Sequence, residues 1–153
     1  MSAHEFLNPP SWKPARGYSN GVAASGRTLY LGGIIGWNGQ QEFDSDDFID
    51  QVAQTLRNIV EVLAVGGARP EHLVRLTWYV TDRDEYVARQ NELGAVYRQI
   101  IGKYFPAMAL VQVVNLVERR AKVEIEATAV VPDSAADAVP GAGSGAGSGA
   151  VPG

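Results

Sequence analysis

Residues 121–131 alternate regularly between apolar and polar side chains. The apolar positions are Val123, Ile125, Ala127 and Ala129, and the polar positions are Lys122, Glu124, Glu126 and Thr128. Successive side chains of a β-strand point to opposite faces of the sheet, so this pattern predicts a strand with one apolar face and one polar face. The apolar face has to pack against other elements. The polar face is either wet or turned toward another subunit across a cleft.

Two stretches carry apolar side chains at the helical spacing of three and four residues. The first stretch, 46–65, has Phe48, Ile49, Val52, Leu56, Ile59, Val60 and Leu63, and the second, 82–101, has Tyr86, Leu93, Val96, Tyr97, Ile100 and Ile101. Aspartates crowd the start of the first helix, where the helix dipole favours negative charge, and the Gly66-Gly67 pair ends it. Asp82 is a predicted cap of the second helix, with Glu85 three residues later, and Gly102 stops that helix.

Segments rich in β-branched and aromatic residues predict further strands at 18–24, 28–34, 73–80 and 110–114. The turn residues 25–27 predict that the first two strands form a hairpin. The complete order is strand, strand, helix, strand, helix, strand, strand. This order predicts an α+β fold in which a mixed β-sheet carries both helices on one face.

The composition of the chain changes after residue 131. Residues 1–131 have the size and apolar content of a single domain. Residues 132–153 are rich in glycine, alanine, serine and proline, and the part after Asp133 holds no aromatic residue and one charge, Asp137. Such a segment buries too little apolar surface to offset the entropy of ordering, so we expect a flexible tail or linker.

Composition excludes several classes of function. The chain has no cysteine, which excludes a disulfide scaffold, a thiolate nucleophile and a cysteine zinc site. His4 and His72 are its only histidines, too few for a histidine-rich metal site. Thirteen basic and 17 acidic residues give a net charge of −4, unlike the basic clusters of nucleic-acid-binding proteins. No apolar run approaches the roughly 20 residues of a membrane span, and no signal pattern starts the chain, so we expect a cytoplasmic protein without nucleic-acid or membrane partners.

Side chains that carry catalytic chemistry are few. The Gly-x-Ser-x-Gly motif of many serine hydrolases is absent. Glu124 and Glu126 share the polar face of the last strand, with Cα atoms about 6–7 Å apart from the strand rise. A carboxylate pair can transfer protons, although carboxylates are far more often ordinary surface groups.

Glycines and aromatic residues mark a second group of candidates. The run 32–36 holds three glycines, which let a backbone bend or let a ligand approach closely. It lacks the complete spacing of a phosphate-binding loop. Trp37, Trp78 and Tyr18 are candidates for a pocket lining, and each is equally compatible with a core or an interface.

A series of short segments follows the order found in one known family. These segments are GYSNG at 17–21, LYLGGII at 29–35, Gln51 with TLRNI at 55–59, GGA at 66–68 with the strand after it, Asn91, FPA at 105–107 and VEIEA at 123–127. Together they resemble the RidA/YjgF family of small enamine and imine deaminases, also labelled endoribonuclease L-PSP. The resemblance covers residues 15–132.

The resemblance implies a chorismate-mutase-like α+β fold and a homotrimer with clefts between its subunits. It also implies hydrolysis of reactive enamines or imines, such as 2-aminoacrylate and its imine, to a keto acid and ammonia, with no metal or organic cofactor. An imine carbon is already electrophilic. Placing a water molecule and moving a proton therefore suffices, and one carboxylate can do both.

Several positions match the family's site residues. Glu124 corresponds to the carboxylate assigned to water activation. Tyr18 corresponds to a tyrosine of the cleft, and the backbone at Gly33 to a segment that lines the site. Asn91 fits the second helix. These correspondences predict that the water-handling half of a deaminase site is present.

Two other family positions are changed. The arginine that follows the Phe-Pro-Ala segment is Met108, and the serine of the strand before the first helix is Gly32. That arginine holds the substrate carboxylate through a bidentate contact, which methionine cannot make. Arg16, Arg119 and Arg120 are the residues from which a replacement guanidinium could come.

Two hypotheses follow. In the first, the protein hydrolyses an enamine or imine that is not a simple α-imino acid, with Met108 and Trp37 offering an apolar surface and Glu124 acting as general base and acid. In the alternative, it is a non-catalytic homotrimer that binds a small metabolite. The net charge and the lack of a long Lys/Arg cluster count against RNA binding.

Overall fold

The computed structural model of the chain describes residues 3–133. Its elements are β1 (Glu5–Phe6), β2 (Val22–Ala23), β3 (Arg27–Tyr30), β4 (Ile34–Ile35), α1 (Phe48–Val65), η1 (Pro70–His72), β5 (Leu73–Val80), α2 (Arg83–Ala88), α3 (Gln90–Ile100), β6 (Ala107–Gln112) and β7 (Val123–Val131). Apart from Pro132 and Asp133, the predicted tail lies outside the described residues.

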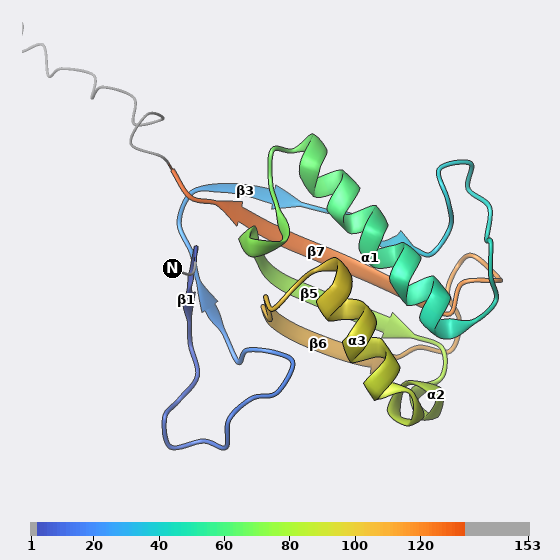
Figure 1. Ribbon diagram of the computed structural model, residues 1–153, viewed down its shortest axis with the longest axis horizontal. Coiled ribbons are helices and arrows are strands. Elements are labelled where there is room, and N and C mark those ends of the chain that lie inside the picture. Colours follow the sequence, from blue (N-terminus) through green and yellow to red (C-terminus); the bar gives the residue numbers. More distant parts are fainter. Residues whose placement is uncertain (1–2, 134–153) are drawn as a thin grey trace, which may run out of the picture.

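The strand β7 organises the main sheet. The sheet order is β3-β7-β5-β6, and β4 also pairs with β7. All pairings of β7 are antiparallel, whereas β5 and β6 are parallel. Figure 1 shows α1 and α3 side by side across one face of this sheet. The prediction of an α+β fold with a mixed sheet and its helices on one face is confirmed.

The core lies between α1 and α3 on one side and the apolar face of the sheet on the other. The stripe of α1 packs against the alternate apolar residues of β7, and the fully buried members of this contact include Phe48, Val52, Leu56, Ile59, Leu63, Val123, Ile125 and Ala129. Each large aliphatic or aromatic side chain contributes about 1.5–3 kcal/mol when fully buried. Burial along β7 alternates as predicted, because Glu124 and Glu126 point away from the helices.

The predicted helix ends are found at the expected residues. Asp47 caps α1 by accepting from the backbone N–H of Asp50 (3.1 Å), and Gly67 follows it with φ of +73°. Asp82 caps α2 by accepting from the N–H of Glu85 (3.0 Å). The second predicted helix is divided, however, because the backbone leaves helical geometry at Arg89.

The break at Arg89 coincides with a contact between helices. The Arg89 guanidinium donates to Asp47 Oδ2 at the start of α1 (2.6 Å) and to both carboxylate oxygens of Glu92. These charge-assisted bonds hold the start of α3 against the start of α1. The chain therefore has three α-helices in its described part, where the sequence pattern predicted two.

The predicted hairpin of 18–24 with 28–34 is wrong. β2 pairs with β1 in a small separate sheet, and β3 pairs with β7. Gly26 turns the chain between the two sheets with φ of +140°, and a Cβ there would lie 2.0 Å from the carbonyl oxygen of Val131. The long apolar partner offered by β7 therefore replaces the short local pairing. The stretch 28–34 is also interrupted between β3 and β4.

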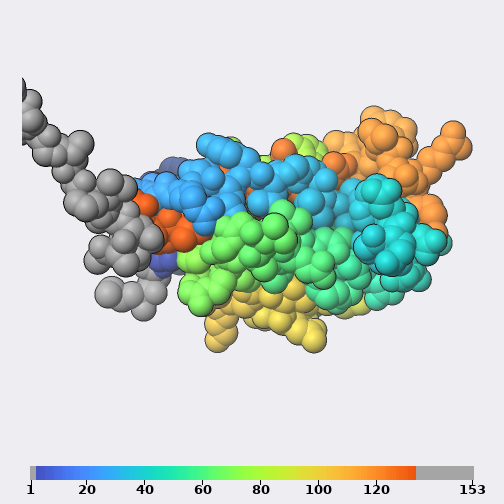
Figure 2. All heavy atoms as spheres, turned by 90° about the horizontal axis from the view of Figure 1, so that it is seen from above, coloured from blue at the N-terminus to red at the C-terminus, as the bar shows by residue number. Residues whose placement is uncertain are grey.

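The loop 113–122 between β6 and β7 projects at one end of the molecule, where it lies beside residues 36–47 (Figures 1 and 2). Buried Gln51 of α1 holds this loop in place. Its Nε2 donates to the carbonyls of Ser45 and Arg120, and its Oε1 accepts from the N–H of Lys122. Within residues 3–133 no helix has both the length and the apolar character to cross a membrane.

Candidate active site

The Glu124 side chain leaves β7 on the side that faces away from the helices and lines a groove that extends past β4 to α1. Glu124 is paired across the sheet with Ile35 of β4 and Tyr79 of β5. The groove has a volume of about 590 Å³, and its lining includes Gly33, Trp37, Asn58, Glu61, Val117, Glu118 and Glu124. Three glutamates and a tryptophan thus share one hollow between the middle of α1 and the projecting loop.

Gly33 is required for the position of the Glu124 carboxylate. A Cβ built on Gly33 would lie 1.9 Å from Glu124 Oε1. Glycine is the one residue type that allows this approach without a shift. The sequence predicted that glycines here let the backbone bend or let a ligand approach; the group that lies against Gly33 is the Glu124 carboxylate of the same chain. Gly32, by contrast, lines neither pocket, and a Cβ on it would meet no atom within 4 Å.

Asn58 fixes the other wall of the groove. Its Nδ2 donates to the carbonyls of Ile35 (2.9 Å) and Trp37 (2.8 Å), which join α1 to β4 and the residues after it. Gln54 donates to Asn58 Oδ1 (2.8 Å) and fixes the orientation of the amide. From the sequence Asn58 has no role beyond the family match. It lies on the flank of the apolar stripe of α1, beside the buried polar residues Gln51 and Thr55.

The two glutamates of the polar face have different surroundings. The Tyr79 hydroxyl donates to Glu126 Oε1 (2.5 Å), and this bond raises the pKa of Tyr79 above its usual value. Within residues 3–133 no hydrogen bond or ion pair engages the Glu124 carboxylate. Glu124 is therefore the one of the pair that is available to a water molecule or a substrate.

A second pocket, which we call the Met108 pocket, lies between α3 and the strands β5 and β6. Its volume is about 870 Å³, and its lining includes Arg16, Tyr18, Trp78, Tyr86, Asn91, Gly94, Tyr97, Arg98, Phe105, Met108 and Leu110. Ser19 holds the N-terminal side of this pocket, because its N–H donates to the carbonyl of Pro106 (3.0 Å) and its hydroxyl to that of Phe105 (2.6 Å). Four predicted site residues, Arg16, Tyr18, Asn91 and Met108, thus lie in one pocket.

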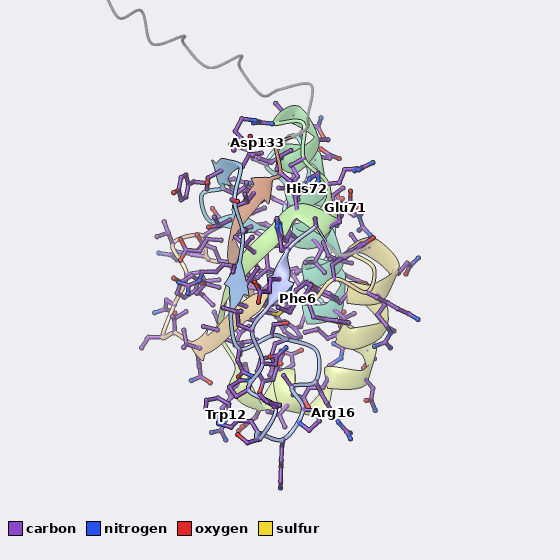
Figure 3. All side chains as sticks on the ribbon, turned by 90° about the vertical axis from the view of Figure 1, so that its left-hand side faces the viewer. Phe6, Trp12, Arg16, Glu71, His72 and Asp133 are labelled. Carbon is purple, nitrogen blue, oxygen red and sulfur yellow. The ribbon has the colours of Figure 1, made fainter. Side chains whose placement is uncertain are left out.

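Of the arginines considered as replacements, Arg16 alone lines this pocket. Figure 3 shows it at the same end of the molecule as Trp12, far from His72. Arg120 is engaged elsewhere, since its Nε donates to Asp46 (2.9 Å) and its guanidinium lies over the ring of Phe43. Arg119 lines neither pocket.

Sequence reasoning missed Arg98, the second arginine of the Met108 pocket. Asn91, Gly94 and Arg98 recur at the spacing i, i+3 and i+7, which places them on one face of α3. The signal was therefore present in the helical periodicity, but Arg98 stands outside the apolar stripe from which the core was predicted.

The side chains of Met108 and Glu124 leave opposite faces of the sheet. Met108 is paired with Leu76, which belongs to the core beneath the helices. Glu124 is paired with Tyr79, three residues further along β5, where the side chains point to the opposite face. One chain therefore separates the predicted site residues. Glu124, Gly33 and Trp37 line the groove, and Met108, Tyr18, Asn91 and Arg16 line the Met108 pocket.

The described residues offer no metal site of ordinary composition. No group of three or more histidine, aspartate or glutamate side chains within residues 3–133 is arranged to hold a metal ion. Both imidazoles make hydrogen bonds to the backbone. His4 Nε2 donates to the carbonyl of His72 (3.0 Å), and His72 Nδ1 accepts from the N–H of Arg69.

A mixed sheet with its helices on one face, and a carboxylate groove along its β4 side, define a small α+β protein of the YjgF fold. A sequence model described as endoribonuclease L-PSP matches residues 9–131, and the chain belongs to this family, which is the RidA/YjgF family. The solved structure of YyfB, a Rid-family protein of unknown function from Yersinia pestis, is similar with a TM-score of 0.76 and 32% identity, covering 84% of this chain and 99% of its own.

Curated relatives agree with this assignment. A RutC family protein of Aquifex aeolicus is 32% identical over 132 residues, which are 82% of this chain and 98% of the relative. A protein of Capra hircus named 2-iminobutanoate/2-iminopropanoate deaminase is 32% identical over 114 residues, which are 74% of this chain and 79% of the relative. The family thus includes imine deaminases.

Proposed function

We propose that this protein hydrolyses an imine, or the enamine in equilibrium with it, whose recognised part is not an α-carboxylate. The observation that carries the proposal is the Glu124 carboxylate, which has no partner in the described part of the chain and lies against Gly33 in a groove. Relatives named as imine deaminases supply the reaction class.

The chemistry requires one group that can accept and return a proton. Glu124 takes a proton from water as the water oxygen attacks the carbon of the protonated imine, which gives a neutral tetrahedral carbinolamine. The same carboxyl group then gives this proton to the amine nitrogen. The C–N bond breaks as Glu124 removes the proton of the new hydroxyl group, and the products are a ketone and ammonia, with the last proton passing from Glu124 to solvent. General acid–base catalysis of this kind contributes about 10²–10⁴ in rate.

The substrate class follows from Met108. An arginine at this position would pair with a carboxylate, and the absence of such a charge-assisted bond costs about 2 kcal/mol or more. In this chain the inner wall of the pocket is formed by Met108, Leu110 and aromatic rings. Such a wall favours an apolar or ring-shaped substrate.

Because Met108 and Glu124 lie on opposite faces of one sheet, we also propose that the working site joins two subunits. The polar face of β7 supports this assembly, since Glu126 is exposed there and Glu124 and Thr128 are half-buried, which leaves surface for a neighbouring subunit to cover. A homotrimer with clefts between neighbouring copies would bring the Met108 pocket of one subunit to the Glu124 groove of the next.

The test compares two imines generated in place: 2-iminopropanoate, and the carboxylate-free imine formed by oxidation of cyclohexylamine. We expect the wild type to accelerate hydrolysis of the second imine and Met108→Arg to shift the preference toward the first. Glu124→Gln should lose at least about 10²-fold in rate. Glu126→Gln is the matched control, because it removes a charge from the same strand face at a carboxylate already engaged by Tyr79.

Two outcomes would contradict the proposal. Fast wild-type turnover of 2-iminopropanoate that is abolished in Glu124→Gln would mean that another group holds the carboxylate, with Arg16 and Arg98 as the candidates. Retained ligand binding without turnover of either imine would favour the non-catalytic metabolite binder.

A further inference from the structure

One residue that lines the Met108 pocket carries a buried hydrogen-bond donor without an acceptor in the described part of the chain. Trp78 of β5 lines the pocket and is 3% exposed, and its indole Nε1 has no partner among the described residues. The indole N–H can only donate. Buried donors are nearly always paired in native proteins, so an unpaired one in a pocket wall indicates where a ligand's acceptor would be stabilised.

Aromatic rings pack beside the Trp78 ring. The rings of Tyr97 and Phe105 are stacked with their centroids 5.5 Å apart, and the ring centroids of Trp78 and Tyr97 are 6.5 Å apart. The Tyr97 hydroxyl already donates to the carbonyl of Tyr104, so it is not available to a ligand. The pocket volume of about 870 Å³ suits a small organic molecule, and its stacked aromatic rings suit a planar one.

The arrangement of charge favours a neutral acceptor. Met108 and Leu110 share the helix-covered face of the sheet with Trp78 and carry no charge. The arginines of the pocket, Arg16 and Arg98, are exposed, and the Arg98 guanidinium lies over Gly94, 3.3 Å from where a Cβ would be. One buried N–H matches a carbonyl or a ring heteroatom, whereas a buried carboxylate needs several donors or a cation.

We propose that Trp78 determines substrate specificity by donating its indole N–H to a neutral carbonyl or ring acceptor on a planar substrate. Because Met108 has no hydrogen-bond donor to offer, the indole N–H would be the polar group that orients the substrate against this apolar wall. The identification of the bound molecule as the substrate rests on the proposed function. The binding of a planar acceptor at Trp78 does not depend on it.

The test uses two probes of one shape, 2-indanone with a carbonyl acceptor and indane without it. Each is titrated into the full ¹⁵N-labelled chain while the indole N–H resonances are followed, with the Trp78 signal assigned by its absence in Trp78→Phe. We expect 2-indanone to bind about tenfold more tightly than indane and to shift the Trp78 N–H signal. Trp78→Phe should bind both probes equally, and Trp12→Phe, which changes a tryptophan that is 62% exposed, should keep the preference.

The wild-type titration stands even where Trp78→Phe does not fold. Equal affinity for the two probes, or an unmoved Trp78 resonance at saturation, overturns the proposal. Tighter binding of indane-2-carboxylate also overturns it, since Arg16 and Arg98 would then recognise an anion. If the protein hydrolyses an imine but shows no preference for 2-indanone, the role of Trp78 is refuted and the proposed reaction stands. A Trp78-dependent preference without any turnover refutes the proposed reaction and leaves the binding site in place.

Discussion

Met108 and Glu124 lie on opposite faces of the same sheet, Met108 beneath the helices and Glu124 on the uncovered side. The parity of side chains along β5 fixes this, because Leu76 and Tyr79, their respective partners, point in opposite directions. A single small molecule cannot contact both residues of one chain. Joint use of the two pockets therefore requires a second copy of the chain.

Complementation between two inactive variants tests this relationship. Glu124→Gln removes the carboxylate, and Gly94→Phe fills the Met108 pocket. If each site takes its groove and its pocket from different subunits, a site works when one subunit supplies an unmutated groove and its neighbour an unmutated pocket. In an equal mixture each of these has a probability of one half, so about one quarter of wild-type activity should return. Activity is measured after mixing has been verified by mass spectrometry. Mixed assemblies without activity would contradict the shared site.

Gly33→Ala should reduce activity while the fold persists. The added Cβ would lie 1.9 Å from Glu124 Oε1, and the flexible end of the glutamate side chain can move away. The displaced carboxylate no longer holds water in the productive position, and we expect a decrease of about tenfold or more in kcat. Gly32→Ala adds the same atom where no neighbour lies within 4 Å, so its kcat should fall much less. Equal decreases in both variants would show that the approach of Glu124 to Gly33 is irrelevant.

Gln51→Leu should destabilise the protein strongly. Gln51 is 1% exposed, and leucine would leave the N–H of Lys122 and the carbonyl of Arg120 without their partner. Unpaired buried groups of this kind should cost about 3 kcal/mol in the free energy of unfolding, measured by urea denaturation. Gln54→Leu, which changes a half-buried glutamine one turn further along α1, should cost less than about 1 kcal/mol. A similar cost for both substitutions would be evidence against the role of Gln51.

Asp47→Asn should weaken stability at neutral pH but not in strong acid. The hydrogen bond from Arg89 holds the pKa of Asp47 below its usual 3.8, so the folded chain binds fewer protons there than the unfolded chain. The stabilisation is complete above the unfolded pKa and disappears as pH falls through the folded pKa. Asparagine still caps α1, so the change isolates the ion pair.

The size of this effect is modest because the Asp47 side chain is 40% exposed and water screens the pair. We expect a difference of about 0.5 kcal/mol between wild type and Asp47→Asn at pH 6, measured by thermal unfolding across a pH series. Asp84→Asn, at an exposed pair with Arg83, should change little. A difference that persists unchanged below the folded pKa would mean that the charge of Asp47 is not its source.

The regular elements follow from local physics, and the sequence therefore predicts most of them. The stripe of α1, its Asp47 cap and the alternation of β7 each depend on residues that are near neighbours in the chain. The predicted hairpin failed for the opposite reason. β3 finds more apolar surface on β7, about a hundred residues away, than on its sequence neighbour, and local turn residues carry no information about that competition.

The same division holds for the candidate site. Residue type and order are enough to establish the fold class, the family, the carboxylate at position 124 and the methionine at position 108. The folded chain was needed to show that Gly33 touches that carboxylate, that Arg98 joins Arg16 in one pocket, and that the indole N–H of Trp78 is unpaired. These facts depend on which strands become neighbours and on which face each side chain emerges, and long-range pairing sets both.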